Sequence, residues 1–266
     1  MKILTLNTHS HLETDYERKL AEFVKAICEL KPDVIALQEV NQSIASKDCE
    51  ACKGIRTIGD IPLKNDNHLL LTINKLKEYG INYHSVWCGI KNGYPGYEEG
   101  AAVMSLSPIE CVKVIRLTGD MLCNQWKKRA AVGIKTKSQW FYSVHTGWWN
   151  DDEEPFKKQW NILKETEKDG SVWLMGDFNN PSDAENEGYS EILRDGWLDT
   201  YMLAANKDIG FTATTKIDGW HGAEEKKIRI DYIFTNKKTA IESSFVIFDG
   251  KNYPKVSDHN GVIVVY

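Results

Sequence analysis

The sequence lacks an excess of basic residues. Its 266 residues include 33 Lys and Arg against 38 Asp and Glu, a formal net charge of -5, and the sequence pI is near 5.8. Proteins that bind long nucleic acids usually carry a basic face that meets the phosphate backbone. The charge balance therefore argues against a duplex substrate without excluding one.

Long apolar runs are also missing. The run Ile3-Leu4-Thr5-Leu6 is too short for the core of a signal peptide, and no stretch approaches the ~20 apolar residues of a membrane-spanning helix. We therefore expect a soluble, cytoplasmic protein with no membrane contact and no obligate protein partner. Internal repeats, low-complexity tracts and linkers are lacking as well, and 42% hydrophobic residues over this length predict one domain spanning residues 1–266.

The cysteines do not form a complete metal-binding pattern. The segment Cys49-Glu50-Ala51-Cys52 has CxxC spacing, but no second CxxC or His pair supplies the other ligands of a zinc site. Reduced thiols are the default in a cytosolic protein. We expect a loop with two free thiols.

The order of the predicted elements favours an α/β fold. Helical spacing predicts helices over residues 16–30, 67–79 and 153–168, whereas residues 41–65 are polar and aperiodic and are expected to form a long surface loop. Strands are expected at residues 2–6, 33–37, 83–87, 101–104, 112–115, 131–134, 140–144, 172–175, 230–235, 240–248 and 262–266. Strands outnumber helices, and helices separate only some of them, which predicts two mixed β-sheets packed face to face with helices outside.

Polar residues recur where the predicted strands end. They are Asn7, Glu39, Glu99, His145, Asp177, Asn179, Asp231, Asp258 and His259. Individually, each has an ordinary explanation as a turn or surface residue, and Asp177 with Asn179 could form an Asx-turn. Together they are an oxygen-rich, thiol-free set that suits Mg²⁺ or Mn²⁺. The order is informative: strand-Asn7, strand-Gln38-Glu39, Tyr97-Glu98-Glu99-Gly100-strand, strand-His145, strand-Gly-Asp177-Phe-Asn179, Arg-Ile-Asp231-Tyr and Ser-Asp258-His259.

This series resembles the endonuclease/exonuclease/phosphatase superfamily, which includes pancreatic-type deoxyribonucleases, abasic-site endonucleases, inositol polyphosphate 5-phosphatases and neutral sphingomyelinases. The resemblance spans Asn7 to His259 and implies a four-layer α/β sandwich that cleaves phosphoesters with a divalent metal ion. It implies that Asn7, Glu39 and Asp258 bind the metal and that Asp177 and Asn179 line the same pocket. It also implies that Asp231 orients His259, the general base or transition-state partner, and that Glu99 pairs with His145.

These residue types suit phosphoester hydrolysis. A metal ion and hydrogen-bond donors offset the charge that builds on the phosphate oxygens, and an imidazole backed by a carboxylate can move a proton near neutral pH. No serine or cysteine lies in a recognisable arrangement of nucleophile, base and orienting group, so water is the expected nucleophile.

The chain has nine tryptophans, and several of them lie outside the apolar runs, where they could contact a substrate. Aromatic faces at the rim of a polar pocket suit sugar rings, although core packing or base stacking are alternatives. We expect Trp148, Trp149 and Trp220 to contact substrate and Arg129 to contact its phosphate, although Arg129 could equally be a solvated strand end. The segments at residues 2–10 and 34–42 look most like those of bacterial maltose 6'-phosphate phosphatases, which implies a small phosphorylated sugar as the substrate.

Three alternatives stay open at this stage. A nuclease would need a groove along a phosphate backbone, and only small basic groups at residues 127–129, 157–158 and 226–229 are available for one. A sphingomyelinase would need an apolar membrane-contacting hairpin and an export signal, and neither is found. A catalytically silent binding module of the same fold is disfavoured because no expected catalytic position is substituted.

Overall fold

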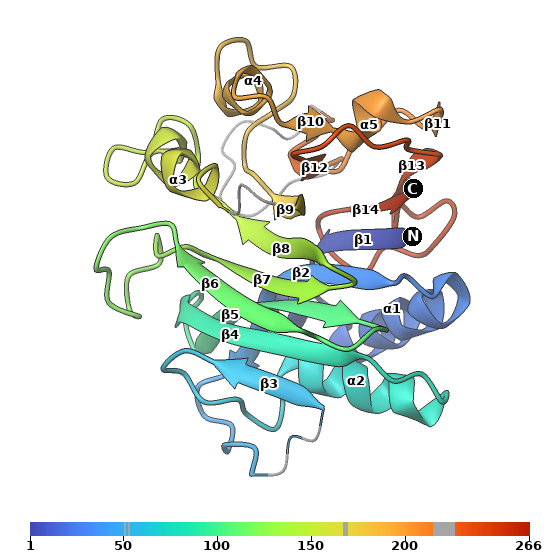
Figure 1. Cartoon of the computed structure of the whole chain (residues 1–266). Coiled ribbons are helices and arrows are strands. Elements are labelled where there is room, and N and C mark those ends of the chain that lie inside the picture. The colour runs from blue at the N-terminus through green and yellow to red at the C-terminus, as the bar shows by residue number, and fades with distance from the viewer. Residues whose placement is uncertain (51, 53, 167–169, 215–226) are drawn as a thin grey trace.

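The computed structural model describes the chain except for residues 51, 53, 167–169 and 215–226 (Figure 1). Trp220, an expected substrate contact, lies outside the described residues. The described chain forms two mixed β-sheets stacked face to face, with helices on the outer sides, which confirms the expected fold class.

The first sheet has eight strands in the order β11-β13-β14-β1-β2-β5-β4-β3. Their bounds are β1 (Lys2–Asn7), β2 (Val34–Ser43), β3 (Ile55–Ile58), β4 (His84–Asn92), β5 (Tyr97–Ser105), β11 (Asn206–Lys207), β13 (Ser243–Ile247) and β14 (Gly261–Val265). β1 and β2 are parallel, whereas β5 is antiparallel to both of its neighbours. The two chain termini lie side by side, where β1 pairs with β14 (Figure 1).

The second sheet has six strands in the order β10-β12-β9-β8-β7-β6. Their bounds are β6 (Cys111–Arg116), β7 (Ala130–Thr136), β8 (Gln139–His145), β9 (Ser171–Asp177), β10 (Leu198–Asp199) and β12 (Asp231–Thr235). β8 and β9 are parallel and β12 is antiparallel to β9, so the end of β8, the end of β9 and the start of β12 meet at one edge of the sheet.

The helices are α1 (Tyr16–Leu30), α2 (His68–Glu78), α3 (Phe156–Leu163), α4 (Gly188–Arg194) and α5 (Thr200–Leu203), with a 3₁₀-helix, η1 (Ser10–Leu12). α1 buries an apolar stripe at helical spacing, and Pro32 follows its C-cap Lys31. Asn67 caps the start of α2: its side chain accepts hydrogen bonds from the backbone N–H groups of Leu69 and Leu70.

The strand alternation sorts the apolar side chains into three layers. In β9, Trp173 and Met175 pack between the sheets, whereas Val172 and Leu174 face α3 and α4. The outer side of the first sheet packs against α1 and α2 in the same way. The result is a helix–sheet–sheet–helix sandwich, because central strands such as β2 and β9 bury both of their faces.

Some sequence predictions were wrong in extent. The loop expected at residues 41–65 contains the end of β2 and the short strand β3, which pairs with β4. The third helix begins only at Phe156, because Pro155 suits a helix start and not its interior. The short helix α4 was not predicted, since one buried turn leaves little periodicity to detect.

The expectation of two free thiols in the CxxC segment was wrong. Cys49 and Cys52 are joined in a disulfide, and the remaining cysteines Cys28, Cys88, Cys111 and Cys123 are free. Sequence spacing alone could not distinguish these states, because CxxC spacing suits free thiols, a metal site or a disulfide equally. Among the described residues, no helix has both the length and the apolar composition needed to span a membrane.

Candidate active site

Three expected site residues lie side by side on neighbouring strands of the second sheet. His145 at the end of β8 is paired in register with Asp177 at the end of β9, and Asp177 is paired with Asp231 at the start of β12. Gly176 precedes Asp177 with φ +149°, and a Cβ there would lie 1.9 Å from the Val144 carbonyl oxygen. The close approach of β8 and β9 that sets His145 beside Asp177 therefore requires glycine at position 176.

The first sheet supplies a second group of polar residues. The pairing of β2 with β5 shifts register between Leu37 and Val40, and within this irregularity Glu39 has φ 50°. Such bulges commonly redirect a side chain beside a functional site. The Asn7 amide donates to Glu39 Oε1 at 3.0 Å and to Asp177 Oδ2 at 3.1 Å. Asn7 therefore links the acidic residues of the two sheets.

His259 is buried between two carboxylates. Its Nδ1 lies 3.0 Å from Asp231 Oδ2, and its Nε2 lies 3.9 Å from Asp177 Oδ2. Burial alone would lower the pKa of His259, but Asp231 and Asp177 outweigh it and raise the pKa well above 6.5. His259 is therefore a cation at neutral pH, which suits contact with a phosphate oxygen.

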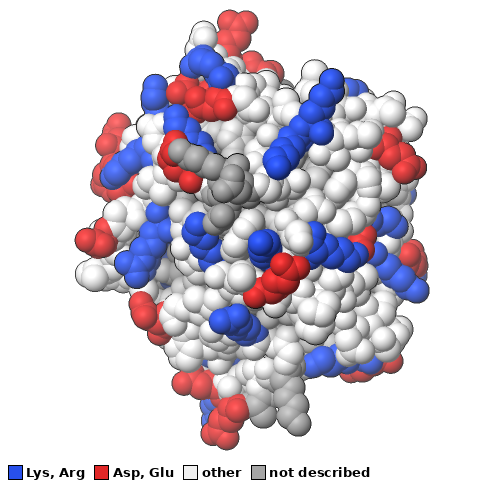
Figure 2. Space-filling view, in the orientation of Figure 1, with Lys and Arg blue, Asp and Glu red and all other residues white. Residues whose placement is uncertain are grey.

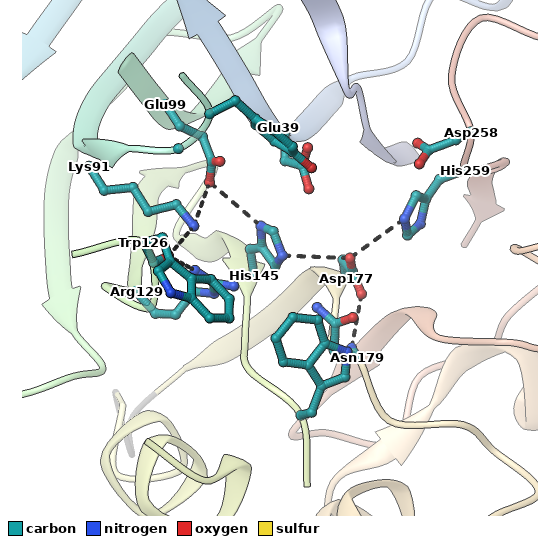
Figure 3. A pocket seen from close by; sticks show the side chains of 13 residues that line it. Glu39, Lys91, Glu99, Trp126, Arg129, His145, Asp177, Asn179, Asp258 and His259 are labelled. Atoms are coloured by element: carbon teal, nitrogen blue, oxygen red, sulfur yellow. Dashed lines mark hydrogen bonds and ion pairs between the residues drawn. The ribbon is translucent and has the colours of Figure 1, made fainter. Parts of the chain in front are cut away.

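His145 has the opposite electrostatic environment. Burial, with Arg129, Lys91 and His259 nearby, lowers the pKa of His145 well below 6.5, so this imidazole is neutral. Its Nε2 lies 3.7 Å from Asp177 Oδ2, and its Nδ1 lies 4.0 Å from Glu99 Oε1. Glu99 is closer to Lys91 Nζ, at 3.2 Å. Figure 3 shows the resulting series of contacts, in which the side chains of Lys91, Glu99, His145, Asp177 and His259 follow one another.

These side chains line a pocket of about 290 Å³. Its expected members are Glu39, Glu99, Arg129, His145, Trp148, Asp177, Asn179, Asp258 and His259. Asn7 and Asp231 lie behind this wall and contact it through hydrogen bonds. Trp149 is directed elsewhere, because its ring packs near Phe156 at a centroid distance of 6.3 Å.

Lys91, Gly93 and Tyr94 were missed in the sequence, and Trp126, a tryptophan outside the apolar runs, was not among the expected substrate contacts. A signal for Lys91 was present, because Gly93-Tyr94-Pro95-Gly96 is typical of a turn and makes β4 and β5 a hairpin in which Lys91 is opposite Glu99. Trp126 stands on the segment between β6 and β7, for which the sequence shows no periodicity. Its ring lies 5.9 Å from that of Trp148 and is 49% exposed. With Tyr94, these two tryptophans form an aromatic rim on the pocket.

The acidic residues fit a divalent cation. Glu39 Oε2 and Asp231 Oδ1 are buried and have no hydrogen-bond partner among the described residues. Burial, together with Glu99 and Asp258, raises the pKa of Glu39 to about 7. Burial and Asp231 raise the pKa of Asp177 to about 7 as well. A divalent ion would satisfy the free oxygens and relieve this repulsion.

Ligand atoms of two residue groups are close enough to share an ion. Those of Asp177, Asp231 and His259 lie within 4.8 Å of one another, as do those of His9, Glu13 and Asp258. In the second group, however, Glu13 is already paired with Lys19 and with His9. The pKa of His9 is raised to about 9, since the hydrogen bond to Glu13 and the charge of Asp258 outweigh burial. Two cations therefore already offset part of the negative charge in the second group.

The outer surface matches the charge balance of the sequence. On the face shown in Figure 2, Lys and Arg side chains are interspersed with Asp and Glu side chains and with uncharged areas. On that face, Lys and Arg side chains lie across the middle, separated by uncharged areas and an acidic group, and many Asp and Glu side chains lie towards the rim.

Comparisons with known proteins agree with this geometry. A family model described as "Endonuclease/Exonuclease/phosphatase family" matches residues 4–259. A solved structure of an endonuclease/exonuclease/phosphatase family protein from Leptotrichia buccalis C-1013-b has 33% sequence identity and a TM-score of 0.87, covering 100% of this chain and 98% of its own. No curated protein was found to match the sequence.

Two more distant structures share the fold. A mannosyl-6-phosphatase from Bacteroides thetaiotaomicron VPI-5482 has 14% identity and a TM-score of 0.64, covering 100% of this chain and 98% of its own. A 3' phosphatase from Neisseria, bound to a product DNA hairpin, has 18% identity and a TM-score of 0.66, covering 100% of this chain and 99% of its own. At these identities the likeness concerns the fold alone.

Proposed function

The chain belongs to the endonuclease/exonuclease/phosphatase family, and from this premise we propose that it is a phosphatase that hydrolyses a small phosphorylated sugar such as maltose 6'-phosphate. The family comprises divalent-metal-dependent phosphoesterases and nucleases. The observation that carries the proposal is one pocket that combines the unpartnered Glu39 Oε2, two histidines in opposite charge states and an aromatic rim. We treat residues 1–266 as a single catalytic domain.

The metal would be held on the acidic side of the pocket. Glu39, Asn7 and Asp258 would bind Mg²⁺ or Mn²⁺, which would supply Lewis-acid stabilisation of charge on a phosphate oxygen. An amide and two carboxylates are the hard oxygen ligands that these ions prefer.

The remaining residues would divide the proton chemistry between them. His259 is a cation held by Asp231 at 3.0 Å, so it would donate a hydrogen bond to the phosphate and stabilise its growing negative charge. Asp177, whose pKa is raised to about 7 by burial and Asp231, is matched to accept the proton of the attacking water. The neutral His145 would contact the phosphate or the leaving oxygen, and Asn179 adds an uncharged amide donor.

The size and rim of the pocket favour a small sugar. Its volume of about 290 Å³ is at the lower limit of ligand pockets, which run from roughly 300 to 1,000 Å³. The apolar faces of Trp126, Trp148 and Tyr94 suit stacking on a sugar ring, while the polar wall suits hydroxyl groups. The fold of the Bacteroides mannosyl-6-phosphatase supports the view that this architecture can serve a sugar phosphate.

A nucleic-acid phosphatase or nuclease is the second candidate. It is favoured by the shared fold of the Neisseria 3' phosphatase and by Lys127, whose ammonium lies 5.5 Å from the Trp126 ring centroid beside the pocket. An aromatic and a cation together can hold a terminal nucleotide. The net charge of -5 counts against a long duplex.

The proposal includes a role in carbohydrate metabolism in the cytoplasm. A sugar phosphate is doubly charged near neutral pH and does not cross a membrane unaided, so a phosphatase of such intermediates would meet them inside the cell. Cell fractionation with an antibody against the chain checks this part.

The decisive experiment measures phosphate release from the monoesters and strand cleavage of the DNA on a denaturing gel, with Mg²⁺ and with a chelator. The substrates are maltose 6'-phosphate, glucose 6-phosphate, an inositol polyphosphate and a short DNA duplex with an abasic site. Preference for the disaccharide phosphate supports the proposal, whereas cleavage of DNA alone would replace it with the nuclease alternative. A catalytically silent module would release no phosphate from any of them.

The aromatic rim is tested on the substrate that the panel selects. Trp148→Ala is expected to raise KM for a sugar phosphate about tenfold while leaving kcat nearly unchanged, since one aromatic contact contributes on the order of 1 kcal/mol. Trp149→Phe is the matched control, because Trp149 packs towards Phe156 and does not line the pocket. An unchanged KM in Trp148→Ala would remove the rim from substrate binding.

A further inference from the structure

Lys91 is a buried cation on the pocket wall that the sequence did not single out. It lies directly opposite Glu99 in the β4–β5 pairing, and its side chain is only 5% exposed. Its Nζ lies 3.2 Å from Glu99 Oε1 and donates to the Trp126 carbonyl at 2.7 Å. An ammonium has three N–H donors, so these partners leave one donor for a ligand.

Arg129 meets Lys91 at the same carbonyl. Arg129 Nη1 donates to the Trp126 carbonyl at 2.9 Å, and the residue is 6% exposed. Its Nε is buried and has no hydrogen-bond partner among the described residues. A buried guanidinium N–H without a partner is costly, which points to an acceptor supplied by a bound ligand.

The pocket is therefore electrically divided. Lys91 and Arg129 stand on one side with the carboxylate of Glu99, Asp177 and Asp258 lie towards the other side, and Glu39 lies between Glu99 and Asp258 (Figure 3). The neutral His145 lies between the two sides, 4.0 Å from Glu99 and 3.7 Å from Asp177. An anion held beside His145 would thus meet a metal from one side and two fixed cations from the other.

We propose that Lys91, together with Arg129, binds the terminal oxygens of the substrate phosphate and selects phosphomonoesters over phosphodiesters. This inference rests on the proposed function and names the residue that sets the ester class. Near neutral pH a monoester carries close to two negative charges on three terminal oxygens, because its second pKa is about 6. A diester carries one charge on two terminal oxygens, so it gains less from a second and a third cation.

Glu98, the neighbour of Glu99 in the hairpin, pairs with a second buried lysine that provides a matched control. Lys64 Nζ lies 3.2 Å from Glu98, its side chain is 8% exposed, and it also donates to a backbone carbonyl, that of Ile44. It does not line the active-site pocket. Lys64 and Lys91 are therefore both buried lysines paired with consecutive glutamates of β5, and they differ in access to the ligand.

The test compares Lys91→Met, Lys91→Arg and Lys64→Met with the wild-type protein. The measured quantity is the ratio of kcat/KM for p-nitrophenyl phosphate to kcat/KM for bis(p-nitrophenyl) phosphate, with Mg²⁺ present. Loss of one charge-assisted hydrogen bond is expected to lower this ratio about 10- to 100-fold in Lys91→Met. Inhibition by inorganic phosphate should also weaken in Lys91→Met. Lys91→Arg should recover most of the ratio, and Lys64→Met should retain the wild-type ratio.

Other outcomes overturn the inference or separate it from the proposed function. An equal fall for both esters in Lys91→Met would mean that Lys91 acts only by positioning Glu99 and the hairpin, and monoester selection would be refuted. If Lys91→Met does not fold, Lys91→Gln is measured with the same ratio and the same phosphate inhibition. If the wild-type protein hydrolyses neither nitrophenyl ester, the sugar-phosphate panel alone decides the proposed function. Thermal stabilisation by inorganic phosphate, in wild type against Lys91→Met, then still decides whether Lys91 binds phosphate.

Discussion

Individual residues of the pocket owe their charge states to their neighbours. Two histidines face the same carboxylate, Asp177, yet His259 gains a proton beside Asp231 whereas His145 loses one beside Arg129 and Lys91. Pairs of titratable groups whose pKa values are pushed apart are typical of sites that do acid–base chemistry. The roles proposed for the two histidines follow from this contrast.

Removing His259 is predicted to affect turnover more than binding. His259→Ala should lower kcat by about 10²–10³-fold, because loss of one donor to the charge that develops on the phosphate costs that much. Asp231→Asn should cause a smaller loss, since it removes the charge that holds the imidazolium. Steady-state kinetics on the preferred phosphate ester measures both, with the exposed His84→Ala as the control. A kcat within a few fold of wild type in His259→Ala would contradict the role.

Metal stabilisation is predicted to grow with pH. Burial, Glu99 and Asp258 raise the pKa of Glu39 from 4.5 to about 7. Between pH 4.5 and pH 7, the Glu39 carboxyl group is therefore protonated more often in the folded, metal-free protein than in the unfolded chain. By linkage, this group lowers metal-free stability as pH rises from 4.5 towards 7, and the loss is complete above 7. A proton competes with the metal below this range.

Thermal unfolding with Mg²⁺ and with a chelator measures this effect. The increase in Tm caused by Mg²⁺ should be small near pH ~5.5 and large near pH ~8, following the proton competition described above. Glu39→Gln should reduce the increase at both values. An increase that is the same at both pH values would contradict the assignment of Glu39 to the metal.

At the scale of elements, the site depends on how closely strand ends approach. β8, β9 and β12 place His145, Asp177 and Asp231 in one row, and the irregularity in β2 redirects Glu39 towards them. The hydrogen bonds of Asn7 to Glu39 and Asp177 join the two sheets at this row. Small displacements of β9 should therefore disturb the chemistry directly.

Gly176→Ala is predicted to damage both stability and activity. Its new Cβ would lie 1.9 Å from the Val144 carbonyl oxygen, so β9 would have to move away from β8. We expect a loss of about 2–3 kcal/mol in the free energy of unfolding, as for other overpacked core sites, and a fall in kcat as Asp177 shifts.

Chemical denaturation and kinetics measure the two effects of Gly176→Ala. The matched control is Gly80→Ala, where φ is +73° but nothing lies within 4 Å. That control should lose only the about 1–2 kcal/mol of a left-handed conformation and keep full activity. Equal losses in the two variants would show that the strand contact is not the cause.

At the scale of the whole molecule, one small pocket is set in an acidic protein. The pocket of about 290 Å³ is lined by residues of both sheets, whereas the face in Figure 2 mixes both signs of charge. Together with the net charge of -5, this favours a ligand whose charge is confined to one group over a polyanion.

Duplex DNA is accordingly predicted to bind weakly. With a chelator present to prevent cleavage, we expect a Kd at or weaker than about 10⁻⁴ M at physiological salt, the weak limit of non-specific binding. Fluorescence anisotropy of a labelled duplex over a range of salt concentrations measures it. Micromolar affinity with a steep salt dependence would instead favour the nuclease alternative.

The sequence alone determined the layers of the fold and the residue types of the site. Strand alternation and strand-end polar residues are local signals, because side-chain period and turn chemistry depend on nearby residues. The sequence therefore predicted the two mixed sheets and the placement of His145, Asp177 and His259 beside strand ends, whereas Glu39 lies within β2 at its irregularity. The roles of these residues stay predictions until the variants are measured.

Only the tertiary structure decided what surrounds these residues. Lys91 lies on the pocket wall because its strand pairs it with Glu99. Trp126 reaches the pocket from a segment whose sequence shows no periodicity. The Cys49–Cys52 disulfide requires that the two thiols meet in space, which their spacing in the sequence does not decide. The opposite charge states of His145 and His259 depend on groups that are distant in sequence but close in space. Burial and the charges of neighbours set a pKa, and neither is encoded in the identity of the residue that titrates.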